Sequence, residues 1–77
     1  MENVRVVGNK CVLRINSQIY PPHVVLKAAE AFKLYGDVAV EENNTQVVIN
    51  PKNVSNTEEI GYEFFDCLLS IIQNLDV

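Results

Sequence analysis

Apolar and polar residues alternate in two short stretches at the start of the chain, Val4 to Val7 and Lys10 to Asn16. Such alternation places every second side chain on the same face of a β-strand. Gly8-Asn9 separates the stretches, and this pair favours a tight hairpin turn because glycine tolerates a positive φ. The sequence therefore predicts a first β-hairpin, with one face formed by Val4, Val6, Cys11, Leu13 and Ile15.

After Pro21 and Pro22 the apolar residues recur at intervals of three and four, which is typical of one side of a helix. Proline suits the first turn because its missing N–H has no partner there, and glycine is common just after the last turn. The pattern predicts a helix from about His23 to Tyr35 that ends at Gly36. Its apolar stripe consists of Val25, Ala28, Ala29, Phe32 and Tyr35.

A second hairpin is predicted from the alternation in Val38 to Glu41 and Gln46 to Asn50, with a polar turn between the two stretches and Pro51 at the end. A last helix follows. Asn56 with Glu59, or Ser55 with Glu58, fits a capping box at its start, and its pattern continues to about Leu75. Gly61 inside this helix costs about 1 kcal/mol relative to alanine, which indicates close packing or an early distortion.

The predicted order is ββαββα, and the fold class is α+β. The simplest architecture is one domain, residues 1–77, with a four-stranded, mostly antiparallel sheet and both helices on one face. Ile15-Asn16 at the end of the first hairpin recurs as Ile49-Asn50 in the second, and at the same spacing Val4 matches Val38. We therefore predict a pseudo-repeat of two hairpin–helix units.

Composition adds limits on the partners. The net charge is −4, and the six Lys and Arg residues do not cluster in the sequence. Because nucleic acid and anionic membranes require clustered cations, we expect neither as a partner. The chain has no apolar run near the length of a membrane span and starts without a signal-peptide pattern. Cys11 and Cys67 form no metal-binding motif, so a cytoplasmic protein with two free thiols is expected.

Catalytic chemistry has no positive signal. His23 is the only histidine, and no partner for a base or a metal site lies near it in the sequence. Cys11 and Cys67 occupy core-type positions. The carboxylates fit solvated turns and the polar side of a helix, namely Glu41, Glu42, Glu58, Glu59, Glu63 and Asp66. We therefore expect no catalytic residue, cofactor or metal, and a protein that is not an enzyme.

The sequence carries more apolar residues than one sheet face and one helix stripe bury. The face of the sheet away from the helices would carry Arg5, Val7, Val12, Arg14, Ala39, Glu41, Gln46 and Val48, and the last helix has a second apolar stripe. Exposed apolar area of this kind is typical of an interface. The alternative is that the valines are scattered over the surface and the last helix is well covered. The candidate interface residues are Val7, Val12, Val48, Tyr62, Phe65, Leu69 and Ile72.

Residues 12 to 73 resemble the small D protein of the His-Xaa-Ser radical S-adenosylmethionine peptide-maturation system. The resemblance lies in Tyr20, Lys27-Ala28-Ala29, Phe32, Pro51-Lys52, Phe65 and Leu68-Leu69. It implies a non-catalytic accessory protein that works beside radical S-adenosylmethionine enzymes. The iron–sulfur cysteines belong to those enzymes, and none is matched in this chain.

Three functions follow from these observations. The first is an interaction protein that binds a peptide or its modifying enzyme, with an exposed strand edge as one route for the peptide. The second is a self-associating structural domain that forms a homodimer through the valine-bearing sheet face or the last helix. The third is a small enzyme or ligand-binding domain around Cys67 or His23.

Overall fold

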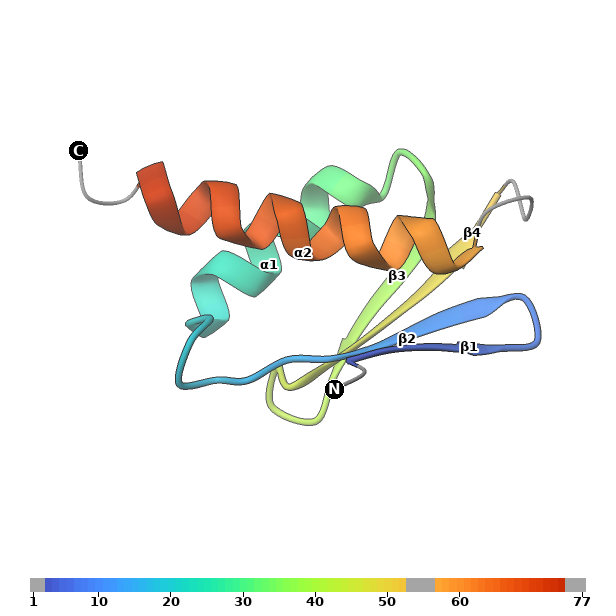
Figure 1. Ribbon diagram of the computed structural model, residues 1–77, viewed down its shortest axis with the longest axis horizontal. Coiled ribbons are helices and arrows are strands. Elements are labelled where there is room, and N and C mark those ends of the chain that lie inside the picture. The colour runs from blue at the N-terminus through green and yellow to red at the C-terminus, as the bar shows by residue number, and fades with distance from the viewer. Residues whose placement is uncertain (1–2, 53–56, 75–77) are drawn as a thin grey trace.

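The computed structural model describes residues 3–52 and 57–74. Within them the chain forms one four-stranded sheet and two helices in the order ββαββα (Figure 1). Every neighbouring pair of strands is antiparallel, which confirms the α+β class. The elements are β1 (Val4–Val7), β2 (Lys10–Arg14), α1 (Pro22–Phe32), β3 (Gly36–Glu41), β4 (Gln46–Pro51) and α2 (Thr57–Asn74).

The sheet has the strand order β1-β2-β4-β3, so the two hairpins join through their second strands. Leu13 of β2 lies opposite Val47 of β4 at the middle of this join. The first strand of each hairpin, β1 or β3, is therefore an open edge of the sheet.

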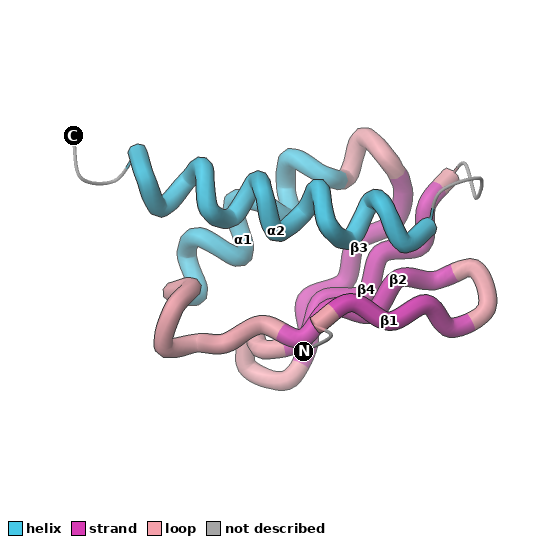
Figure 2. Tube along the Cα trace, in the orientation of Figure 1, coloured by secondary structure: helices cyan, strands magenta, loops and turns pink. Residues whose placement is uncertain are grey.

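Both helices cover the same face of the sheet, as the sequence predicts (Figures 1 and 2). α2 packs over β1 and β2, whereas α1 packs over β3 and against α2. The two helices meet at Phe32 and Phe64, whose ring centroids are 5.1 Å apart in an edge-to-face arrangement. The buried core consists of Val4, Cys11, Leu13, Ile15, Val24, Val25, Ala28, Ala29, Phe32, Val47, Ile49, Phe64 and Leu68.

The first helix is shorter than predicted. It ends at Phe32, and Tyr35 lies half exposed beyond it instead of completing the apolar stripe. The backbone carbonyl of Tyr35 accepts a hydrogen bond from the Lys52 N–H at 2.9 Å, so the chain has already joined the sheet there. Gly36 is accordingly the first residue of β3, where a Cβ would collide with the Asn50 carbonyl of β4. A close approach between strands, not a helix end, accounts for this glycine.

The remaining boundaries differ by a few residues. β2 ends at Arg14, and Asn16 then shapes the turn toward α1, because its side-chain oxygen accepts from the Gln18 N–H at 2.9 Å. α2 ends at Asn74. The predicted N-cap residues, Ser55 and Asn56, and the predicted end near Leu75 lie outside the described residues, whereas Glu58 and Glu59 lie in the first turn of α2.

Gly61 is explained by close packing. It lies where α2 crosses the first hairpin, and a Cβ there would come within 2.6 Å of Cys11 Sγ and 2.7 Å of Val4 Cγ1. Any larger residue would push the helix away from the sheet. Of the two interpretations of this glycine, the structure supports the contact and not a distortion of the helix, which is continuous from Thr57.

The pseudo-repeat stays a prediction. Pairing in the sheet sets Val4 opposite Leu13, and Val40 opposite Val47. A superposition of the hairpins by these pairs would match Val4 with Val40, whereas the spacing in the sequence matches it with Val38. The difference arises because the second turn spans residues 42–45 and the first only residues 8 and 9.

Candidate functional site

The face of the sheet away from the helices carries both polar and apolar side chains. Its side chains alternate with the core positions along each strand, so their register follows from the strand pairing. A central row crosses all four strands and consists of Arg5, Val12, Val48 and Ala39. We call this surface the helix-free face; the rows on either side of the central row are mainly polar.

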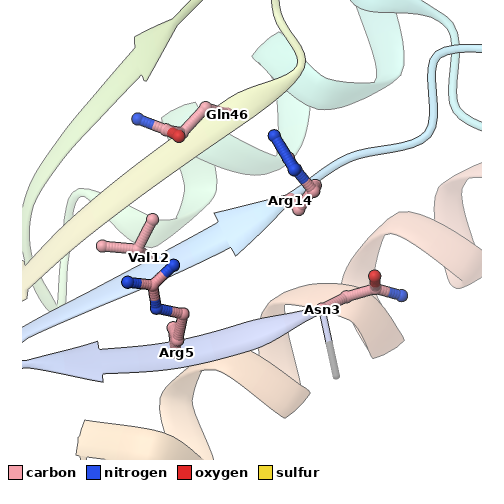
Figure 3. A pocket seen from close by; sticks show the side chains of 5 residues that line it. All are labelled: Asn3, Arg5, Val12, Arg14 and Gln46. Carbon is pink, nitrogen blue, oxygen red and sulfur yellow. The ribbon is translucent and has the colours of Figure 1, made fainter. Parts of the chain in front are cut away.

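One shallow depression of about 190 Å³ opens on this face over the first hairpin. Figure 3 shows its lining side chains standing on β1, β2 and β4 and just before β1. They are Asn3, Arg5, Val12, Arg14 and Gln46. Within residues 3–52 and 57–74, neither Arg5 nor Arg14 forms an ion pair; Lys33 and Glu30 form the salt bridge found there, at 3.0 Å.

A second depression of about 240 Å³ lies over β3 and β4, at the other end of the central row, and Val48 and Ala39 of that row help to line it. Its lining differs in charge, because Asp37 and Glu41 contribute two carboxylates. The Glu41 carboxylate also accepts a hydrogen bond from Gln46 Nε2 at 3.0 Å. The full lining is Lys10, Asp37, Val38, Ala39, Glu41, Val48 and Asn50. The helix-free face is thus basic over β1 and β2 and acidic over β3.

The edge of the sheet at β1 is the second feature of interest. The Arg14 N–H donates to the Asn3 carbonyl at 2.9 Å, so the backbone groups of Asn3 face β2. Because this direction alternates along an antiparallel strand, the N–H and C=O groups of Val4 and Val6 point away from the sheet. The side chains of Val6 and Val7 are 44% and 52% exposed. β1 therefore presents outward-facing backbone groups, which bond to none of residues 3–52 and 57–74 in the sheet, beside exposed apolar side chains.

The candidate interface residues fall into two groups. Val7, Val12 and Val48 lie on the helix-free face, with Val12 and Val48 half-buried between their neighbours. On α2, Phe65 and Ile72 pack partly against the core. The ring of Phe65 also lies beside that of Tyr20, with 6.1 Å between the ring centroids. Tyr62 and Leu69 remain half exposed on α2. The second stripe of the last helix is thus covered in part by the segment that leads into α1.

The two thiols are free and sit in surroundings that disfavour the thiolate. Cys11 is buried, and its pKa is raised above the ordinary 9.0, mainly because burial desolvates the thiolate and to a smaller extent because of the charge of Glu58. A backbone hydrogen bond at Gly61 opposes this shift. Burial also raises the pKa of the Cys67 thiol. His23 is exposed at the start of α1.

Among residues 3–52 and 57–74, no group of three or more His, Cys, Asp or Glu residues is arranged to hold a metal ion. None of the described helices has the length and apolar character needed to cross a membrane. Comparison of the chain with family models, curated proteins and solved structures found no match.

The depression lined by Arg5 and Arg14 is the part of the candidate site that the sequence patterns do not reveal. Both arginines were assigned to the correct face from the alternation alone. Their diagonal placement around Val12 depends on the register between β1 and β2, where Arg5 pairs with Val12 and Val4 with Leu13. The two-residue turn at Gly8-Asn9 sets that register, so the signal was present in the first hairpin.

Proposed function

We propose that this protein is a non-catalytic interaction module that binds an extended peptide along the edge of β1. One observation carries the proposal: β1 offers the outward N–H and C=O groups of Val4 and Val6 next to the exposed side chains of Val6 and Val7. A peptide that pairs with such an edge gains backbone hydrogen bonds, and its alternate side chains gain apolar contacts.

The other edge of the sheet is less suited to this role. On β3 the inward valines, Val38 and Val40, already pack against the core, and α1 lies over the strand. Its helix-free side carries Asp37 and Glu41, and charged side chains on an edge discourage further pairing. β1 carries no carboxylate and a single cation, Arg5.

The resemblance to the small D protein of the His-Xaa-Ser system suggests the kind of peptide. In that setting the partner is a precursor peptide or the radical S-adenosylmethionine enzyme that modifies it. Most residues that carry the resemblance lie in α1, in α2 and at the end of β4, while Tyr20 and Lys52 lie just outside these elements. None of them lies in β1, so they support the scaffold and leave the β1 edge free to bind.

The test is a titration of the isotope-labelled protein with a synthetic peptide of His-Val-Ser repeats, followed by amide chemical shifts and hydrogen exchange. We expect the Val4 and Val6 amides to shift and to become protected. Val6→Pro should abolish both effects, because it removes an outward N–H without removing a hydrogen bond to β2.

Two control variants separate edge pairing from general damage. Val6→Thr keeps the N–H and should bind, whereas Val38→Pro alters the opposite edge and should bind as the natural chain does. Binding that persists in Val6→Pro, or shifts confined to β3, would show that the peptide does not add to β1.

A further inference from the structure

We propose that the helix-free face binds a second copy of this chain, with the basic half of each copy against the acidic half of the other. This inference concerns the face of the sheet and not the outward backbone groups of β1. The two surfaces share only the Val7 side chain, and each proposal can fail without the other. The inference rests on the distribution of charge within the face, because an interface between identical copies must be complementary to itself.

The charges are segregated across the sheet. Residues 3–14, which form the first hairpin, contain Arg5, Lys10 and Arg14 and no carboxylate. All three cations point to the helix-free face, since they alternate with the core residues of β1 and β2. On the opposite side of that face, β3 carries Asp37 and Glu41. The half-buried Val12 and Val48 lie between the two charged regions.

The strand order selects one geometry for two such faces. A twofold axis parallel to the strands lays β1 of each copy over β3 of the other, because these strands are the opposite edges of the sheet. An axis that crosses the strands lays β1 over β1 and sets Arg5 against Arg5. Only the parallel axis brings unlike charges together, so the charge pattern favours it.

The register places individual residues in this arrangement. Arg5 shares the central row with Ala39, so it would lie over Ala39 of the second copy, between Asp37 and Glu41 on the same strand. Arg14 shares a row with Gln46, whose side chain is hydrogen-bonded to Glu41. Val12 would meet Val48 of the second copy. Each of the two guanidinium groups thus gains a carboxylate, and the valines gain an apolar contact.

The size of the face sets the expected strength. Four strands about 4.8 Å apart, with about five residues each, give a surface of roughly 15 to 20 Å on each side. Interfaces of this size fall below the usual range for stable complexes. The dimer is therefore weak, and its formation depends on the charges and decreases with added salt.

The test uses two variants that reverse the charges of either half, Arg5→Glu with Arg14→Glu and Asp37→Lys with Glu41→Lys. All four side chains are exposed, so the fold tolerates the changes. Each variant alone presents like charges to its own copy, whereas a mixture of the two restores unlike charges. Sedimentation velocity at low salt should show that the natural chain associates. Each variant alone should associate with an affinity at least about tenfold lower, and the equimolar mixture should associate again.

Neutral variants provide a second measurement that does not depend on reversed charges. Arg14→Gln and Glu41→Gln should each weaken association and reduce its dependence on salt. Three outcomes would overturn the proposal: a natural chain that stays monomeric up to millimolar concentration at low salt, a mixture that associates no better than its components, or a loss confined to the arginine variant. The last would indicate that the arginines of one copy bind carboxylates of the other copy outside Asp37 and Glu41.

Discussion

The two faces of the sheet are formed by the same strands but differ in burial and in charge. Leu13 and Val47 face each other on the helix-covered side and are fully buried. One residue along each strand, Val12 and Val48 face each other on the other side and remain half-buried. The difference is what lies above them, because α2 packs over β2 and β4 on one side and no described helix covers the other. Identical strand pairing therefore supports the fold through one face and leaves the other available for contacts.

Substitutions at adjacent residues should separate the faces most clearly. Leu13→Ala removes a fully buried side chain and should lower the free energy of unfolding by about 2–5 kcal/mol. Val12→Ala, the matched control on the helix-free face, should cost less than about 1 kcal/mol. Urea denaturation at low protein concentration measures both. Equal losses for the two variants would mean that the faces do not differ in the way described.

A smaller effect is expected where α2 touches the covered face. Gly61→Ala places a methyl group within 2.6 Å of Cys11 Sγ. Overpacking of this kind costs about 1–3 kcal/mol, which exceeds the gain of about 1 kcal/mol in helix propensity. Ser70→Ala, at an exposed position of the same helix, should leave stability unchanged or slightly raised. A stabilising Gly61→Ala would show that the helix does not approach the sheet so closely.

The smallest effect should appear at alkaline pH. The folded state raises the pKa of Cys11 and Cys67 above 9.0, so it holds these thiol protons more tightly than the unfolded chain does. The contribution of the two thiols to the free energy of unfolding is therefore complete below pH 9. It decreases as the pH rises above 9, by at most about 1.4 kcal/mol per pH unit for each thiol. Thermal unfolding between pH 8 and 10 should show the decline, and Cys11→Ala should reduce its slope. A stability that rises over this range would contradict the burial of the thiols.

Much of the covered face was predictable from the sequence, because alternation in the strands assigns Cys11, Leu13, Val47 and Ile49 to one side irrespective of strand order. The strand order itself was not predictable. It depends on which strands of the two hairpins meet, and β2 and β4 do so through contacts between residues far apart in the chain. The apolar spacing continues to Tyr35 and therefore predicts too long a first helix. In the structure α1 ends at Phe32, and the Tyr35 carbonyl already accepts a hydrogen bond from the Lys52 N–H.

The helix-free face was predictable only as a list of residues. That Arg5 and Arg14 flank Val12, while Asp37 and Glu41 lie across the sheet, requires the register of three strand pairs. Spacing in the sequence gives the face on which a side chain lies, but not its neighbours on the next strand. The self-complementary arrangement of charge therefore emerged only from the structure.

The dependence of unfolding on protein concentration tests the central claim most directly, namely that one face holds the fold together and the other holds a second copy. At low salt the denaturation midpoint of the natural chain should rise with protein concentration, because dimer formation stabilises the folded state. Arg5→Glu with Arg14→Glu should remove that rise while leaving the free energy of unfolding at high dilution within about 0.5 kcal/mol. A midpoint of the natural chain that does not change with concentration, or a charge-reversed variant that is unstable even at high dilution, would contradict the account.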